Sequence, residues 1–282
     1  MADASAGAQS ASYPAASEAL RRYGGLEVEA RQVQRMVGEL GPLLAEVLDR
    51  PAPFQKESPS PTVYVSMDAT GVPMAREELE GRSGKQPDGS AKTREVKLGC
   101  VFTQHHTDEE GRPWRDLDST TYVASFDPSA DFGHHLRREA QRRKVFQAQK
   151  IILLGDGAPW IWEQARIHFP QAVQILDFYH ASEHLKLLAE AIHPNAPETV
   201  HSTLRHWQEC LRRDQLGQVI IETLARLPRS GPRREEVDRQ LAYMETNRHR
   251  MQYGTFQKHG WFIGSGVIEA GCKTLIGQRL KQ

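Results

Sequence analysis

Short runs of alternating or continuous hydrophobic residues between positions 62 and 176 predict the strands of a β-sheet. The stretch 62–68 alternates, so Tyr64, Ser66 and Asp68 share one face, and the strand is expected to end at Asp68. Further strands are expected at 96–102, around 120–125, at 151–154 and at 173–176. The run at 151–154 is apolar on both faces, which is typical of a covered, parallel strand.

Segments with the spacing of helices lie between the later strands and after the last one. A basic helix is expected from about 130 to 146, and a second from Pro159 to Phe169, since proline fits the first turn of a helix. Residues 181–253 have helical spacing with proline-containing breaks at 193–197 and 227–232. The order β-β-β-α-β-α-β predicts an α/β fold with a ribonuclease-H-like mixed sheet and a helical insertion before the last helix. A right-handed crossover can place the strand at 151–154 parallel to the first strand.

The chain divides into segments of different composition. Residues 1–18 are rich in Ala and Ser and predict a disordered tail, and 51–61, with four prolines, predict a linker. Residues 19–50 are expected to be helical, with Gly41-Pro42 dividing them into two short helices that form either a helix-turn-helix or a packed lead-in. The core is expected at 62–180, the helical insertion at 181–255 and the final helix region at 256–282.

Composition narrows the classes of function. The 36 basic residues balance the 36 acidic ones, so DNA would be contacted through local basic patches and not through a global charge. The three cysteines have neither metal-ligand nor disulfide spacing, which suits a reducing compartment. No apolar stretch approaches the roughly 20 residues of a membrane helix, and no secretory pattern opens the chain. We therefore expect a cytoplasmic protein without a membrane partner.

Three acidic residues stand where a two-metal site would need them. Asp68 and Asp156 follow hydrophobic strands, and Glu269 follows Gly-Ser-Gly at the start of an expected helix. Each residue also has a structural interpretation, as a turn residue, a helix cap and a first-turn glutamate respectively. If the two strands are parallel neighbours, however, Asp68 and Asp156 lie side by side. Adjacent carboxylates repel unless they share a cation or a proton, which favours a metal site.

The stretch Asp177-Phe-Tyr-His-Ala-Ser-Glu-His184 permits another interpretation. His180-x-x-Glu183-His184 matches the inverted zinc-protease pattern, which would need Glu222 or Glu245 as a third ligand. The same residues are equally consistent with the solvated face of an amphipathic helix.

The ordered set of motifs resembles a known family. Asp68 in Ser-Met-Asp-Ala-Thr-Gly, Asp156 in Gly-Asp-Gly-Ala-Pro-Trp, Asp177-Phe-Tyr-His180 and Glu269 in Gly-Ser-Gly-Val-Ile-Glu are similar to the DDE transposases of bacterial insertion sequences. The resemblance is narrowest to the ISKra type of the Mutator-like branch, whose signature is D, D, C or D-x-x-H, and E. It runs from about residue 60 to the end. Family members extend further at both ends, so a truncated chain is expected.

The resemblance implies DNA strand cleavage and strand transfer at insertion-sequence ends. Asp68, Asp156 and Glu269 would hold two Mg²⁺ (or Mn²⁺) ions, His180 would orient substrate, and Asp177 would support the ligands. The implied partners are transposon ends and target DNA, with a homo-oligomer forming on DNA in the nucleoid. Expected DNA contacts are Arg137, Arg138, Arg142, Arg143, Lys144, Arg233, Arg234 and Lys273. An inactive DNA-binding remnant of a transposase and a zinc metallopeptidase are the alternatives.

Overall fold

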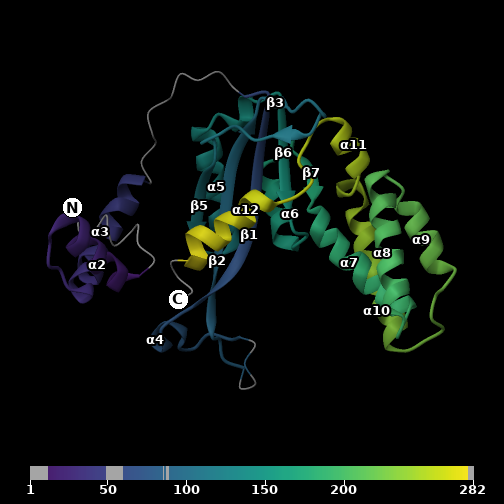
Figure 1. Cartoon of the computed structure of the whole chain (residues 1–282), viewed down its shortest axis with the longest axis horizontal. Coiled ribbons are helices and arrows are strands. Elements are labelled where there is room, and N and C mark those ends of the chain that lie inside the picture. Colours follow the sequence, from purple (N-terminus) through teal and green to yellow (C-terminus); the bar gives the residue numbers. More distant parts are fainter. Residues whose placement is uncertain (1–11, 49–59, 85, 87–88, 279–282) are drawn as a thin grey trace. The chain divides into compact units, whose positions relative to one another are not determined.

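The structure is a computed structural model that describes residues 12–48, 60–84, 86 and 89–278 (Figure 1). Its internal contacts divide the chain into two compact units. The larger unit comprises Pro59–Asp68 and Lys97–Glu269. The smaller comprises Met1–Ser58, Ala69–Val96 and Ala270–Gln282. None of the helices in the described part is both long and apolar enough to cross a membrane.

A five-stranded mixed sheet has the strand order β5-β2-β1-β6-β7. β1 is parallel to β6 and β6 is parallel to β7, whereas β2 and β5 are antiparallel. The strands are β1 (Thr62–Pro73), β2 (Thr93–Gln104), β5 (Thr121–Ser125), β6 (Lys150–Gly155) and β7 (Val173–Leu176). All five match strands expected from the sequence, and the mixed α/β arrangement is consistent with the ribonuclease-H-like sheet predicted.

Two helices, α5 (Ser129–Arg142) and α6 (Pro159–His168), cover one face of the sheet (Figure 1). A Cβ added at Gly99 of β2 would lie 2.8 Å from Leu136 of α5. A Cβ at Gly155 of β6 would be equally close to Ile161 of α6. Glycine at these two positions therefore permits the close approach of helix to strand.

The opposite face of the sheet is covered by the segment that leads to Glu269. Tyr64 of β1 stacks on Phe102 of β2 with ring centroids 4.7 Å apart, and Phe262 packs edge-on at 5.4 Å from Tyr64. The Tyr64 hydroxyl donates to Gln104 Oε1 at 2.5 Å and accepts from the Phe262 amide at 3.2 Å. Because side chains alternate along a strand, this is also the face of β1 that carries Asp68.

A block of helices follows β7 and lies beside the edge of the sheet that β7 forms (Figure 1). α7 packs against α8 and α10 around buried residues that include Trp207 and Met244. Its elements are α7 (Phe178–Ile192), α8 (Pro197–Arg212), α9 (Leu216–Leu224), α10 (Pro232–Asn247), η2 (Arg248–Arg250) and α11 (Tyr253–Lys258). The breaks predicted at 193–197 and 227–232 are confirmed. α12 (Gly266–Gly271) and the π-helix η3 (Cys272–Gly277) come last.

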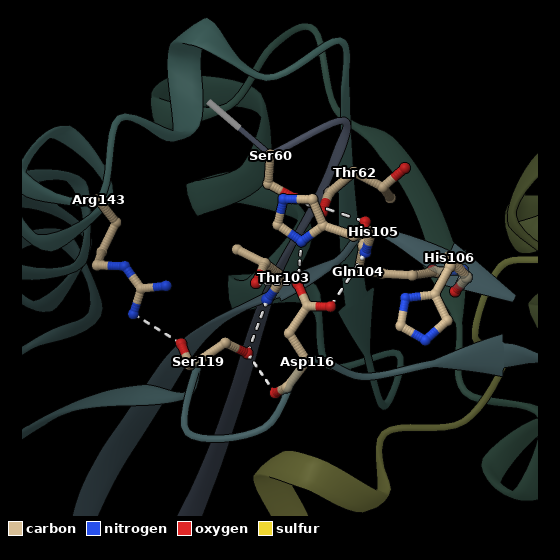
Figure 2. A network of polar contacts seen from close by, with 9 residues as sticks. All are labelled: Ser60, Thr62, Thr103, Gln104, His105, His106, Asp116, Ser119 and Arg143. Carbon is tan, nitrogen blue, oxygen red and sulfur yellow. Dashed lines mark hydrogen bonds and ion pairs between the residues drawn. The ribbon is translucent and has the colours of Figure 1, made fainter. Parts of the chain in front are cut away.

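A polar network closes the end of β2, and we call it the β2-end network (Figure 2). Asp116 accepts hydrogen bonds from the Thr103 hydroxyl at 2.5 Å and from the His105 amide at 3.2 Å, and its Oδ2 lies 2.5 Å from His105 Nδ1. Ser119 donates to the Asp116 carbonyl, and Arg143 donates to the Ser119 carbonyl at 2.7 Å. The network fixes the loop that contains the two-stranded ribbon of β3 (His106–Thr107) and β4 (Pro113–Trp114).

The smaller unit corrects two expectations near the N-terminus. α2 (Tyr13–Gly24) includes residues 13–18, which the sequence placed in a disordered tail, because Ser12 caps the helix and Ala16 and Leu20 pack on Val33. α3 (Ala30–Leu48) is one helix with Pro42 inside it, and not two short helices. The rest of the predicted tail, residues 1–11, and residues 51–59 of the predicted linker lie outside the described residues.

The first strand is longer than the sequence indicated. β1 continues five residues beyond Asp68 to Pro73, and Val72 within this extension is buried. A Cβ added at Gly71 would lie 3.0 Å from Thr93 Oγ1. Gly71 therefore marks a close approach to the start of β2 and not the end of the strand. A short helix, α4 (Arg76–Leu79), follows.

Candidate active site

The register between β1 and β6 brings two of the predicted acids to the same level. The last paired residues of the two strands are Ser66 and Leu154, and the Ser66 hydroxyl donates to the Leu154 carbonyl at 3.0 Å. Continued by two residues, this register would align Asp68 with Asp156. Because partners in a parallel register face the same side of a sheet, we expect both acids on the face covered by the segment that leads to Glu269.

A third aspartate extends the same row. β6 and β7 pair up to Gly155 and Leu176, and the Asp177 amide donates to the Gly155 carbonyl at 2.8 Å. Asp156 and Asp177 are each the next residue of their strand. Asp156 and Asp177 thus follow the ends of two parallel strands and Asp68 lies within the third, and we call these three residues the aspartate row.

Asp156 is not the N-cap of α6 that its sequence context suggested, because Ala158 holds that position without a side-chain cap, but Asp156 does bind the backbone of the turn before the helix. Its Oδ1 accepts the Ala158 amide at 2.9 Å, just before Pro159 opens α6. Gly157 between them has φ +98°, a conformation that side chains disfavour. The tight turn fixes the aspartate at the strand end and occupies only one of its two carboxylate oxygens with this bond.

Asp177 is fully buried and caps α7. Its Oδ1 accepts the amides of Tyr179 at 2.7 Å and His180 at 2.9 Å. Its Oδ2 accepts the Ser265 amide at 2.5 Å, which ties the end of β7 to the segment before α12. The helix start and a distant segment therefore hold this carboxylate from two sides.

Ser265 brings Glu269 to the same place. The Ser265 hydroxyl donates to Glu269 Oε1 at 2.9 Å, while its amide binds Asp177. One potential ligand atom each from Asp177, His180 and Glu269 lies within 4.8 Å of the other two. We call these three residues the Asp177–His180–Glu269 cluster.

The described residues contain no comparable group that includes Asp68 or Asp156. Glu269 is thus gathered with Asp177 and His180, which the sequence placed in supporting roles. Convergence of Asp68, Asp156 and Glu269 on shared ions stays a prediction.

Comparisons with known proteins add little to this geometry. No protein-family model matches the chain, and no curated protein matches it. Among solved structures, a Drosophila P element transposase strand transfer complex aligns over 94% of this chain and 87% of that chain, with a TM-score of 0.31 and 9% identity. A likeness this distant does not establish a shared fold or activity.

Two tyrosines of the helical block reach the site without any signal in the sequence. A Cβ at Gly157 would collide with the Tyr243 hydroxyl, which lies against the turn that follows Asp156. Burial, followed by the negative charge of Asp156, raises the pKa of Tyr243 to about 12, with Asp177 adding to the effect. The hydroxyls of Tyr243 and Tyr253 are buried and have no hydrogen-bond partner among the described residues. No motif marks them, because helical spacing alone does not say which neighbour a tyrosine faces.

The zinc-peptidase arrangement is not assembled in the described residues. His184 Nδ1 lies 2.6 Å from Gln240 Oε1, and its ring stacks on Tyr243 at 3.6 Å. Glu222 is bound by His206 and Trp207, and Glu245 pairs with Arg248. His180 shares a potential metal site with Asp177 and Glu269, and not with His184.

The arginines predicted to contact DNA make local contacts around α5. The predicted basic helix to residue 146 ends at Arg142, because Lys144 adopts a left-handed φ of 53°. Arg137 donates to the His168 carbonyl at 2.8 Å, Arg138 lies 2.6 Å from His135 Nδ1, Arg142 pairs with Glu139 at 2.5 Å, and Arg143 belongs to the β2-end network.

The remaining predicted DNA contacts are spread over two other elements. Arg233 and Arg234 lie in the first turn of α10, and Arg234 pairs with Asp238 at 2.8 Å. Lys273 lies in η3. DNA binding by any of these basic residues stays a prediction.

Proposed function

We propose that this chain is a DNA transposase that cleaves and joins DNA strands at the ends of a mobile element with divalent cations. The aspartate row carries this proposal, because it places carboxylates on three neighbouring parallel strands or directly after them and receives Glu269 beside Asp177. The order of the five strands and the helical block before Glu269 support a ribonuclease-H-like catalytic core.

The donor chemistry at this edge fits magnesium or manganese. Carboxylate oxygens are hard ligands of the kind that Mg²⁺ prefers. Gathering several carboxylates is unfavourable without a compensating cation. Among the described residues, neither Asp177 nor Glu269 pairs with an arginine or lysine, so no side chain supplies that charge. Asp68, Asp156 and Glu269 would hold two ions. When bound, such ions activate a water or 3′-hydroxyl and stabilise the leaving oxygen during in-line displacement.

The chain's own residues would position the reactants. The turn at Gly157 and the hydrogen bond from the Ala158 amide hold Asp156 in place, and Ser265 joins Asp177 to Glu269. Such fixed positions lower the reorganisation needed when a phosphodiester binds. Transposon ends and target DNA would lie over this edge, and two copies of the chain would pair two ends.

Strand cleavage by the purified full chain tests the proposal. The substrate is a supercoiled plasmid that carries the DNA flanking the gene, with Mg²⁺ or Mn²⁺ added. We expect nicking that chelation stops and that Asp156→Ala abolishes, while His184→Ala has no effect. DNA binding without nicking by the wild-type chain would instead support an inactive remnant. Peptidase activity that depends on His184 would overturn the proposal.

A further inference from the structure

Two carboxylates from distant parts of the chain are held together by a single serine. The Ser265 amide and hydroxyl donate to Asp177 and to Glu269 respectively. These are neutral donors, so they fix the two acids without cancelling their charges. Two negative groups at this separation favour uptake of a cation or a proton.

An imidazole completes the set of ligands. The backbone amide of His180 is bound to Asp177 Oδ1, which fixes the residue in the first turn of α7. Its ring Nδ1 lies 3.4 Å from Glu183 Oε2. Histidines that bind metals commonly direct one ring N–H to a carboxylate, and the other nitrogen then keeps its lone pair for the ion. Glu183 is placed to favour this tautomer.

A buried phenol points independently to a ligand at this place. Tyr253 is fully buried, and its hydroxyl has no hydrogen-bond partner among the described residues. Its ring packs edge-on against Phe178, the neighbour of Asp177, at 5.1 Å. A buried donor without a partner is costly, and an oxygen ligand of a bound ion would satisfy it.

We propose that Asp177, His180 and Glu269 bind one divalent cation through two carboxylate oxygens and one imidazole nitrogen, and that this site prefers Mn²⁺ to Mg²⁺. Imidazole is a good ligand for transition metals, whereas Mg²⁺ favours oxygen ligands and retained waters. Glu269 would join this cation to the metal site of the proposed transposase. The inference rests on that function for the use of the ion, although binding itself needs no DNA.

Calorimetric titration of the full chain without DNA measures the preference. We expect Mn²⁺ to bind about tenfold more tightly than Mg²⁺. His180→Ala should weaken Mn²⁺ binding by about 10- to 100-fold and remove most of the preference. His184→Ala is the matched control, one helical turn further along α7, and should bind Mn²⁺ like the wild type. Equal Mn²⁺ affinity in the His180→Ala and wild-type chains would overturn the proposal.

A spectroscopic measurement avoids dependence on whether a variant folds. Electron spin-echo modulation of bound Mn²⁺ detects a directly coordinated imidazole nitrogen. We expect a ¹⁴N coupling in the wild-type chain and in Asp68→Asn, but none in His180→Ala. Its absence from the Mn²⁺-loaded wild type would overturn the proposal. If the chain shows the coupling but never cleaves DNA, the cation site stands and the proposed function fails. If the chain cleaves DNA without the coupling, the proposed function stands and the cation site fails.

Discussion

Two acidic regions of this protein hold their carboxylates in different ways. In the β2-end network, Asp116 is a single acid surrounded by donors from Thr103 and His105 (Figure 2). In the Asp177–His180–Glu269 cluster, two acids face each other and share the neutral donor Ser265. The first arrangement is complete within the protein, whereas the second is the one that we propose to bind a cation. The contrast separates an acid that supports the fold from acids suited to chemistry.

Among the substitutions that test this contrast, Glu269→Gln should have the largest effect on activity. The amide keeps the shape and can still accept from Ser265, but it removes the negative charge from the cluster. We expect the rate of strand cleavage to fall by about 1,000-fold, equivalent to about 4 kcal/mol of transition-state stabilisation. Initial rates of plasmid nicking measure this loss. Glu245→Gln, which alters an exposed partner of Arg248, is the control, and full activity of Glu269→Gln would contradict the prediction.

Cation binding at the Asp177–His180–Glu269 cluster should stabilise the folded chain. At a Mn²⁺ concentration about 100 times the dissociation constant, we expect a gain of about 2.7 kcal/mol in the free energy of unfolding. Chelation should reverse the gain, and Glu269→Gln should lose most of it. Denaturant unfolding with and without Mn²⁺ measures the difference. An equal gain in wild type and Glu269→Gln would place the ion elsewhere.

Asp116→Ala should weaken the fold without affecting the metal. The substitution leaves the Thr103 hydroxyl and both donors of His105 without their acceptor, at a cost of about 2 kcal/mol. Urea unfolding reports this loss, and titration with Mn²⁺ should show unchanged affinity. A change in Mn²⁺ affinity with unaltered stability would reverse the roles that we assign to the two regions.

Two tyrosines offer a smaller test of the same distinction. Tyr64 uses its hydroxyl twice, so Tyr64→Phe should destabilise the chain by about 1–2 kcal/mol. The Tyr243 hydroxyl has no partner among the described residues, so we expect Tyr243→Phe to change stability by less than about 0.5 kcal/mol. Thermal unfolding of the two variants measures both changes. Similar losses of stability in both would show that the Tyr243 hydroxyl is hydrogen-bonded in solution.

The smallest expected effect is on the acid side of the stability profile. Burial alone would raise the pKa of Asp116, but hydrogen bonds from Thr103 and His105 outweigh it and lower the pKa below its ordinary value of 3.8. A carboxyl whose pKa is lowered in the folded state stabilises the protein at pH values above its unfolded pKa. This contribution is lost as the pH falls through the folded pKa. Asp116→Asn should therefore flatten the fall in stability below about pH 4, as followed by circular dichroism. An identical slope in both chains would contradict this.

Local patterns were sufficient to predict the strands and most helices. Alternation or continuous hydrophobic runs identified all five strands of the sheet, and the two proline-containing breaks were predicted correctly, but the break between Arg212 and Leu216 was not. Two errors fall at glycine and proline, which predicted ends that the structure does not have. β1 passes through Gly71 because Thr93 of a neighbouring strand lies against it, and α3 accommodates Pro42 within one helix.

The amino-acid sequence by itself determined that Asp156 and Asp177 follow strands and that Glu269 follows a Gly-Ser-Gly segment. Strand periodicity and turn residues are local properties, so Asp156 and Asp177 could be predicted at strand ends. Only the tertiary structure decided that Ser265 joins Asp177 to Glu269, and that Tyr243 and Tyr253 approach from the helical block. These contacts join residues that are far apart in the sequence. Their geometry depends on how whole helices and strands pack, and the spacing of residues along the chain does not encode that packing.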